Sequence, residues 1–224
     1  MTKQKKRTQN YLQIMRRAVE EPGSKYSSTN SSKGALLTES DVLFSYLARN
    51  NGDLHSARHA VIHENIFAKK TYQTRKRCWT VLHSRYFPNQ LSPEHLHPIV
   101  EIHRAKASQI VKRGILYFHF TTSDLFAYQA TVKLLYGMFR RGLSNIGPRD
   151  IGEFLDSQKE SHPEIETWSY QTRRSLVSHY LSAVRDFGLL EGKARKRIHK
   201  PMADQNLLLY IVTILRDCGK GVRE

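Results

Sequence analysis

The sequence predicts a mainly α-helical protein, with an N-terminal helical domain of the helix-turn-helix kind and a C-terminal winged-helix domain that carries a small β-hairpin wing. Apolar residues recur at helical spacing along most of the chain, and the last third holds a long amphipathic helix followed by a short, strongly basic turn. We therefore expect a basic, partly flexible N-terminal arm over residues 1–33, a helical domain over 34–142 and a winged-helix domain over 143–224.

Composition narrows the class of partner. The 224 residues include 39% hydrophobic and 10% aromatic residues, which suffices for a folded core, and they carry a formal net charge of +16. Such an excess of Lys and Arg in a folded protein indicates a polyanionic partner or a membrane surface. Nucleic acid is the commoner of these two partners, so it is the one we expect.

Cysteine usage and hydropathy indicate a protein of the reducing cytoplasm. Cys78 and Cys218 lack any C-x-x-C spacing, so neither a disulfide framework nor a zinc ribbon is predicted. The basic N-terminus, Met1 to Asn10, has no apolar stretch behind it and is not a secretory signal. The longest apolar run, Leu207 to Leu215, is about half the length of a membrane span and predicts a buried helix.

The N-terminal half begins with a linker and continues with three short helices. Ser24 to Lys33 contains five serines and almost nothing apolar, which is typical of a flexible connector. Thr38 is expected to cap a helix from Glu39 to Ala48, and Asp53 one that runs to about Glu64. A third helix is expected from about Tyr72 to Tyr86, and tight turns between the three predict a helix-turn-helix-like unit.

The middle of the chain is also expected to be helical. Ser92-Pro93-Glu94 is a helix-start signal, with the cap first and proline at the first helical position. The run from Ile110 to Phe120 fits either a helix or a buried strand, and a helix is favoured because no turn pair marks a hairpin. Thr122 or Ser123 is then expected to cap a helix from Asp124 to Arg141, which Gly142 ends.

Two further helices open the C-terminal third. Asn145-Ile146-Gly147-Pro148 predicts the start of a helix from about Arg149 to Glu160, and a longer helix is expected from about Ser169 to Phe187. One sector of the longer helix is apolar and includes Leu176, Tyr180 and Val184. The opposite sector is small and polar, so its backbone could approach a nucleic-acid groove closely; it comprises Gln171, Ser175, Ser178 and Ser182, flanked by Arg174 and Arg185.

A short hairpin is expected after this helix. Gly188-Leu189-Leu190 would tie its first strand to the core, and the eight residues from Lys193 to Lys200 include five Lys or Arg. Residues 143–166 have two basic and six acidic groups, whereas residues 167–201 have eight basic and two acidic. This separation of sign favours a nucleic-acid-binding face, although a solvated basic surface or a protein-binding winged helix remains an alternative.

A second basic surface is expected over the segment from Lys69 to Arg85, which includes most of the third N-terminal helix. Its six Lys or Arg are interleaved with Tyr72 and Trp79 and have no acidic residue among them. The alternative is that Trp79 belongs to the core and the charges form only a solvated face. Two basic surfaces would hold DNA at two points. Together they give the predicted DNA-binding residues: Lys69, Lys70, Arg75, Lys76, Arg77, Gln171, Arg173, Arg174, Ser178, Arg185, Lys193, Arg195, Lys196, Arg197 and Lys200. The helical wheel turns Arg173 toward the inner side of its helix.

No catalytic or metal-binding motif is found. His55, His59 and His63 line one edge of a helix, but no H-E-x-x-H arrangement, Cys or Asp completes a zinc site, so we expect surface or partly buried histidines. The sequence lacks a phosphate-binding P-loop, a G-x-S-x-G elbow and the clustered carboxylates with a nearby lysine of a metal-dependent nuclease. We expect neither an enzyme nor a cofactor.

Several segments resemble the BrxA family of small proteins encoded in BREX bacteriophage-resistance systems. They are Gly34-Ala35-Leu36-Leu37 with Glu39-Ser40, Glu64-Asn65, Ile151 to Leu155, His162-Pro163-Glu164, Trp168-Ser169, Thr172-Arg173-Arg174 and Gly188-Leu189-Leu190. The resemblance covers about residues 33 to 215 and implies a mostly helical, DNA-associated protein that works beside the system's methyltransferase and ATPase. The family has also been likened to an RNA-binding antitermination factor and labelled an inner-membrane protein. The lack of an apolar span argues against the second label, and the resemblance supplies no catalytic residues.

The residues and the resemblance together predict a non-enzymatic, cytoplasmic protein that binds double-stranded DNA, mainly at its phosphates, as an accessory of a BREX defence system. Other BREX components are further expected partners. A membrane is not expected as a partner. The alternatives are an RNA-binding antitermination-like factor, a protein-binding scaffold within the defence complex, and a transcriptional repressor, for which Leu207 to Leu215 could serve as a dimerisation helix.

Overall fold

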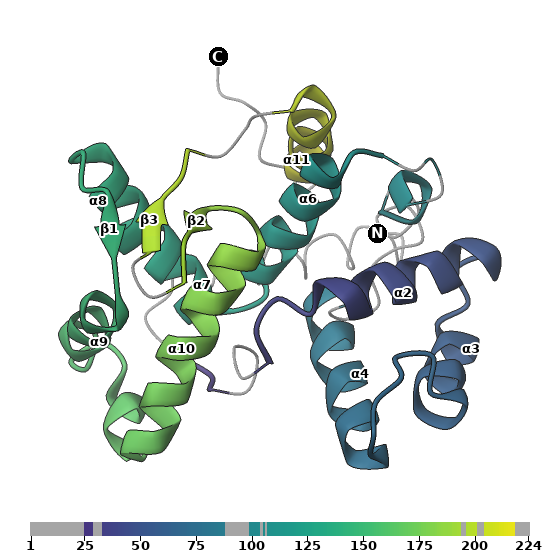
Figure 1. Cartoon of the computed structure of the whole chain (residues 1–224), viewed down its shortest axis with the longest axis horizontal. Helices are drawn as coiled ribbons and strands as arrows, with labels where there is room; N and C mark the ends of the chain where they lie inside the picture. Colours follow the sequence, from purple (N-terminus) through teal and green to yellow (C-terminus); the bar gives the residue numbers. More distant parts are fainter. Residues whose placement is uncertain are drawn as a thin grey trace, which may run out of the picture. The chain divides into compact units, whose positions relative to one another are not determined.

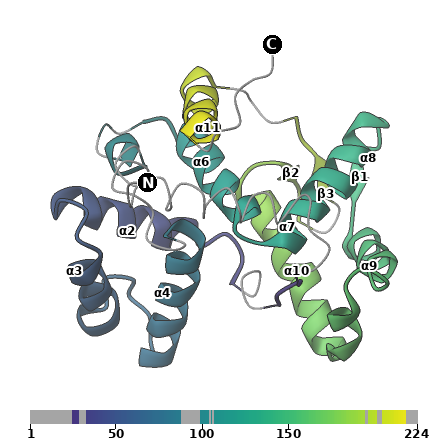
Figure 2. The same cartoon turned by 180° about the vertical axis from the view of Figure 1, so that it is seen from behind.

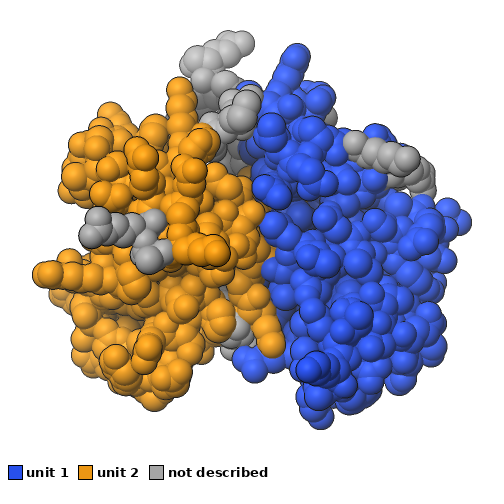
Figure 3. Space-filling model, in the orientation of Figure 1, with its two compact units in different colours: residues 1–13, 36–116, 203–224 blue, residues 14–35, 117–202 orange. Residues whose placement is uncertain are grey.

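The structure, a computed structural model, describes residues 25–28, 33–87, 99–103, 105, 107–193, 196–200 and 204–217. These residues are mainly α-helical, as predicted, and include a small three-stranded antiparallel sheet near the C-terminal end (Figure 1). They fall into two compact units (Figure 3). Unit 1 holds the described residues of 36–116 and 203–224, and unit 2 holds those of 14–35 and 117–202.

Unit 1 opens with the three predicted helices, α2 (Leu37–Arg49), α3 (Leu54–His59) and α4 (Tyr72–Tyr86), with a π-helical turn, η2 (Ala60–Glu64), continuing α3. The Asp53 cap is confirmed, because its carboxylate accepts from the backbone N–H of His55 at 2.9 Å. The prediction that Thr38 caps the first of these helices is wrong. The helix starts before Thr38, and its cap position is Leu36, which has left-handed backbone angles and no side-chain cap.

The core of unit 1 is aromatic. Phe44 of α2 meets Tyr86 of α4 edge-on at 5.1 Å between ring centroids and stacks on His103 at 4.8 Å. The Ser40 and Tyr86 hydroxyls lie 3.1 Å apart, so the buried tyrosine hydroxyl has a hydrogen-bond partner. Trp79 is 8% exposed, which supports its assignment to the core rather than to a surface.

The ambiguous middle run is the helix α6 (Gln109–Thr122), as favoured. In unit 1, α6 packs against α11 (Gln205–Asp217) at Gly114, where a Cβ would lie 2.3 Å from Leu207 Cδ2 and would displace that side chain. Tyr210 is buried. The prediction that this whole apolar run is buried is wrong, since its outer positions are 50 to 64% exposed: Leu208, Leu209 and Val212. Across the described part of the chain, no helix has the length and hydrophobicity that a membrane span requires.

Unit 1 should lose stability in mild acid because of its buried histidines. His103 Nδ1 donates to the Ile99 carbonyl at 2.9 Å, and burial lowers the pKa of His103 despite the nearby Asp41 carboxylate. Burial also lowers the pKa of His83. A pKa that is lower in the folded state means that stability is full above the ordinary value, about 6.5, and declines as the pH falls from there toward the lowered value.

We therefore expect unit 1 to melt at a lower temperature at about pH 5.5 than at about pH 7.5. Trp79 fluorescence in a Trp168→Phe variant measures this unit alone, because the chain has only two tryptophans. The variant His103→Gln should show a smaller difference between the two pH values. An equal difference in both proteins would mean that His103 does not carry the effect.

Unit 2 begins with α7 (Leu125–Gln129), a π-helical segment η3 (Ala130–Leu135) and α8 (Tyr136–Arg140), which together form the helix predicted from Asp124 to Arg141. Its cap is Asp124, whose Oδ1 accepts from the Ala127 N–H at 2.8 Å, and neither Thr122 nor Ser123 as predicted. Thr122 is instead the last residue of α6. Gly142, with φ of +73°, follows the end of the helix as expected.

The rest of unit 2 consists of β1 (Asn145–Ile146), α9 (Pro148–Ser157), a 3-10 turn η4 (Pro163–Thr167), α10 (Tyr170–Asp186), β2 (Leu190–Glu191) and β3 (Lys196–Ile198). The predicted hairpin is confirmed as β2 and β3, and β1, which was not predicted as a strand, pairs with β3 on its other side. Helix α10 packs against α9 and β2, as views from opposite sides show (Figures 1 and 2).

The core of unit 2 centres on Tyr180 of α10, which is fully buried. Its ring meets Phe126 of α7 edge-on at 5.4 Å between centroids, and its hydroxyl lies 3.1 Å from that of Thr131. The apolar sector predicted for this helix is confirmed, since Leu176, Tyr180 and Val184 are all buried. On the opposite sector, Gln171 and Ser178 are exposed, whereas Ser175 and Ser182 are half-buried.

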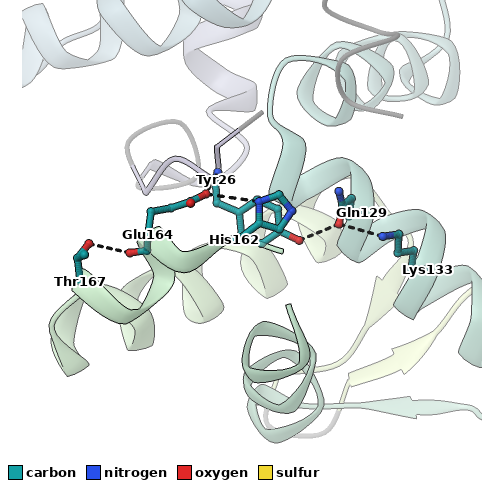
Figure 4. A network of polar contacts seen from close by, with 6 residues as sticks. All are labelled: Tyr26, Gln129, Lys133, His162, Glu164 and Thr167. Atoms are coloured by element: carbon teal, nitrogen blue, oxygen red, sulfur yellow. Dashed lines mark hydrogen bonds and ion pairs between the residues drawn. The ribbon is translucent and has the colours of Figure 1, made fainter. Parts of the chain in front are cut away.

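The N-terminal segment is attached to unit 2 at Tyr26, which lies in the stretch predicted as a flexible connector and yet is 4% exposed. Figure 4 shows its ring stacked on His162, at 3.9 Å between centroids. Its hydroxyl donates to Gln129 Oε1 at 2.9 Å, and its backbone N–H donates to the Glu164 carboxylate. Burial, with the Asp124 and Glu164 carboxylates nearby, raises the pKa of Tyr26, so the hydroxyl stays a donor.

Removing this anchor should destabilise unit 2. We expect Tyr26→Ala to lower its free energy of unfolding by about 2 kcal/mol, less than for a central core residue because the segment around it can relax. Tyr26→Phe keeps the stack and loses one hydrogen bond, so about 1 kcal/mol is expected. Urea unfolding monitored by Trp168 fluorescence in a Trp79→Phe variant measures unit 2. Equal losses for the two substitutions would show that the hydrogen bond, and not the stack, holds the segment.

Candidate nucleic-acid interface

The first half of helix α10 presents an exposed strip. The Ser169 hydroxyl accepts from the Thr172 N–H at 3.1 Å and caps the helix, so its first turn is firmly placed. Tyr170 is 78% exposed, and the predicted site residues Gln171, Arg174 and Ser178 are exposed as well. Ser178 has a small side chain, so it leaves the backbone of α10 accessible within the strip, as expected.

Beside this strip lies a groove of about 580 Å³, bounded by α9, α10 and β3. Leu155 of α9 and Val177 and Leu181 of α10 give it an apolar floor. Four of the predicted site residues, which come from two elements of unit 2, also line it: Arg173, Arg174, Ser178 and Lys196. The sequence alone did not indicate this groove, because it depends on the tertiary packing that brings β3 close to α10.

Two of the predicted arginines are partly neutralised by carboxylates of the chain. Arg173 pairs with Asp156 of α9, which agrees with its predicted inward turn. Asp156 also pairs with Lys159 at 2.8 Å, and these two cations, Lys159 foremost, lower the pKa of its carboxyl. Arg185 pairs with its neighbour Asp186 at 2.8 Å. Arg174, by contrast, makes no ion pair with any residue that the structure describes.

The hairpin supplies further cations. Lys196 is half-buried, and its ammonium donates to the Lys193 carbonyl at 2.9 Å, which fixes the direction of the side chain. Arg197 is exposed and lies opposite Glu191 in the strand register, without an ion pair between the two among the described contacts. Lys193 and Lys200 are exposed, while the predicted residue Arg195 lies outside the described residues.

The second predicted surface lies on α4 of unit 1 and on the residues just before it, and it is partly exposed. Lys70, Lys76 and Arg77 are exposed. The Tyr72 ring has the Arg75 guanidinium 5.7 Å and the Lys76 ammonium 5.8 Å from its centre, so aromatic and basic groups do lie together. Lys69 is paired with Glu39 of α2, and the hydrogen bond between them raises the pKa of Lys69. Arg85 is 2% exposed and is no part of any surface.

The histidine row shows no sign of a metal site. His55, His59 and His63 are exposed, as expected, and His59 stacks on His63 at 4.9 Å between ring centroids. His59 Nδ1 lies 3.0 Å from a Glu64 carboxylate oxygen. Among the described residues, no group of three or more His, Cys, Asp or Glu side chains is placed to hold a metal ion.

Sequence reasoning missed Tyr170 as a site residue. It lies one helical turn before Arg174 and on the same side of α10, at the end of the groove. That spacing was visible in the sequence, but nothing marked which side of the helix the rest of the fold would leave open. The structure supplies this missing information.

The chain resembles known proteins at two levels. Residues 24–214 match the model of the family described as BrxA. A similar solved structure is the crystal structure of an uncharacterized protein from Magnetospirillum magneticum, with a TM-score of 0.68 and 15% sequence identity over 87% of this chain and 98% of that chain. At this identity the likeness establishes a shared fold alone. No curated protein matches the chain.

Proposed function

The chain belongs to the BrxA family, and from this premise we propose that it is a non-enzymatic accessory protein of a BREX phage-defence system that binds double-stranded DNA through unit 2. The contacts would be mainly to phosphates, with α10 and the β2–β3 hairpin as the binding elements. Other components of the system are further proposed partners.

The order of elements in unit 2 supports a winged helix. The helices α7 and α8, then β1, α9, α10, β2 and β3, with strand order β1-β3-β2, follow the arrangement in which the last helix is the recognition helix and the hairpin is the wing. The 3-10 turn η4 takes the place of the tight turn between α9 and α10. On this reading α10 would enter the major groove and β2–β3 would lie beside it along the phosphates.

The observation that carries the proposal is the meeting of Arg174 of α10 and Lys196 of β3 at one groove. Neither cation is paired with a carboxylate among the described residues. Cations kept together without counter-charges are costly unless a polyanion approaches them, and phosphates of a duplex do so at regular spacing. The exposed Gln171 and Ser178 add uncharged donors for phosphates or base edges.

The basic surface of α4 is proposed as a second contact in unit 1. Lys70, Arg75, Lys76 and Arg77 would contribute, whereas Lys69 would add little because Glu39 already compensates its charge. The three-helix unit α2, α3 and α4 would be the helix-turn-helix-like element predicted from the sequence. A second contact would raise the number of phosphates engaged and make binding more sensitive to salt.

Fluorescence anisotropy with a labelled duplex of about 20 base pairs, two helical turns, tests the proposal. At about 50 mM salt we expect clear binding that weakens steeply as salt is added, because phosphate contacts release counterions. Structured RNA of the same length, added as competitor, should displace the duplex poorly. If RNA competes at least about tenfold better than unlabelled duplex, the RNA-binding antitermination alternative replaces this proposal, and if no nucleic acid binds, the scaffold alternative does.

A further inference from the structure

The groove beside α10 has an exposed aromatic ring at one end that a phosphate-binding surface does not require. Tyr170 is the first residue of α10 and 78% exposed, the largest exposed fraction among the large hydrophobic residues that the structure describes. It lines the groove together with Arg173 and Arg174. A large ring held in water next to cations is the arrangement that stacks nucleobases in proteins that bind single strands.

The floor of the groove is suited to a flat, weakly polar ligand. Leu155, Val177 and Leu181 offer no hydrogen bonds, so phosphates gain nothing from reaching them. Gly152 of α9 also lines the groove and has no heavy atom within 4 Å of the place where a Cβ would sit, so the groove is open at this position. A volume of about 580 Å³ lies within the range of pockets that hold drug-sized molecules, and a nucleotide is of that size.

The charges around the groove complement a phosphate attached to such a ligand. Its lining includes three cationic side chains, Arg173, Arg174 and Lys196, against one carboxylate, that of Asp156. The Asp156 carboxylate is already paired with Arg173 and Lys159. Arg174 therefore remains for a phosphate, and the Lys196 ammonium, which donates one hydrogen bond to the Lys193 carbonyl, has two donors left for it. The Ser178 hydroxyl is a further donor. The apolar floor and the exposed Tyr170 ring suit the base of a nucleotide, and the two cations suit its phosphate.

We propose that this groove holds one unpaired nucleotide, with its base against Tyr170 and its phosphate between Arg174 and Lys196. The inference rests on the proposed binding of DNA and names the substrate more closely. A base inside a duplex has to be unstacked and unpaired before it can enter a groove, which costs a few kcal/mol. A nucleotide in a single-stranded extension at a duplex end, or in a gap, does not bear this cost and is the substrate we expect. The protein should therefore prefer a duplex with an overhang to a blunt one.

The test compares two labelled duplexes of about 20 base pairs, one blunt and one with a short single-stranded overhang, by anisotropy at one salt concentration. We expect the wild-type chain to bind the overhang substrate about tenfold more tightly, the size of effect that one base stacked on an aromatic ring gives. Tyr170→Ala should lose this preference, so that it binds the blunt and the overhang duplex with equal affinity. Tyr170→Phe keeps an aromatic face and should retain the preference.

A second variant tests the groove without touching Tyr170 or any charge. Gly152→Leu adds a side chain at a groove-lining position where a Cβ meets no heavy atom within 4 Å, so it should also abolish the preference and bind the two duplexes equally. An excess of free deoxyadenosine monophosphate distinguishes the source of the nucleotide. If the free nucleotide competes for the groove and abolishes the overhang preference, free nucleotides bind the same site. If it has no effect, the groove binds only a nucleotide that is tethered to a duplex.

Two results would overturn the inference while leaving the proposed function standing. One is equal binding of blunt and overhang duplexes by the wild-type chain. The other is an equal loss for both duplexes in Tyr170→Ala, which would make Tyr170 an ordinary duplex contact. Failure of the wild-type chain to bind either duplex would instead contradict the proposed function itself.

Discussion

Replacing Arg174, Lys196 and Arg197 together with alanine is expected to weaken binding of duplex DNA by roughly 500-fold at about 0.1 M salt. Each phosphate contact adds about 0.9 to the slope of log affinity against log salt, so three lost contacts should lower that slope by about 2.7. Arg174 and Lys196 line the groove and Arg197 is exposed on the same strand as Lys196. Anisotropy titrations at several salt concentrations give both quantities.

A matched control removes the same charge from other elements of the same unit. Lys133, Arg140 and Arg141 lie on η3, on α8 and directly after α8, and all three are exposed. Their triple alanine variant changes the net charge of unit 2 equally, and we expect its salt slope to stay within about one unit of the wild-type value. Equal losses in the two triple variants would mean that DNA responds to overall charge and not to the α10–hairpin face.

Tyr180→Ala is expected to lower the free energy of unfolding of unit 2 by about 4 kcal/mol, the largest stability effect we predict. The ring is fully buried, and Phe126 packs edge-on against it. Its removal leaves a cavity under the proposed recognition helix and strips the Thr131 hydroxyl of a partner 3.1 Å away. Urea unfolding followed by Trp168 fluorescence in the Trp79→Phe background measures the loss.

The conservative variant separates packing from hydrogen bonding at this position. Tyr180→Phe keeps the ring and loses only the hydroxyl, so it should cost about 1 kcal/mol. It should also leave DNA binding unchanged, because no part of Tyr180 is exposed. A loss in Tyr180→Phe as large as that in Tyr180→Ala would show that the buried hydroxyl, and not the ring, organises this core.

The helices could be predicted where periodicity and local chemistry agree. The bounds of α4 were predicted at Tyr72 and Tyr86, and the α10 helix was predicted to within one residue at each end. In both cases apolar residues recur at helical spacing, a signal that acts within a few residues, and in the structure Thr71 and Ser169 cap the two helices. The β2–β3 hairpin was found for the same reason, since the glycine and leucines that begin it follow the helix directly.

The misses concern interactions between distant segments. β1 has two residues, too few to show an alternating pattern, and exists through its pairing with β3. Tyr26 was assigned to a connector because its neighbours are polar, yet its partners lie more than 100 residues away. The pairing of Arg173 with Asp156 and of Lys69 with Glu39 likewise depends on which helices pack together.

For the candidate site, the sequence predicted a basic helix and a basic hairpin but not their meeting place. Composition could count the cations between residues 167 and 201, and helical periodicity could orient most of those on α10. Only the fold brings Lys196 to the same groove as Arg174 and opens that groove toward Tyr170. The identity of the site therefore came from residue chemistry, while its shape came from tertiary packing.

The most direct test of the central claim is an NMR titration of isotope-labelled protein with a blunt duplex of about 12 base pairs, slightly more than one helical turn. We predict that the largest shift changes fall on Gln171, Arg174 and Ser178 of α10 and on residues 196–200 of the hairpin. Signals of Lys133 and Arg140 should move little. Changes centred away from α10 and the hairpin, or none at about 50 mM salt, would contradict the claim that this face of unit 2 binds DNA.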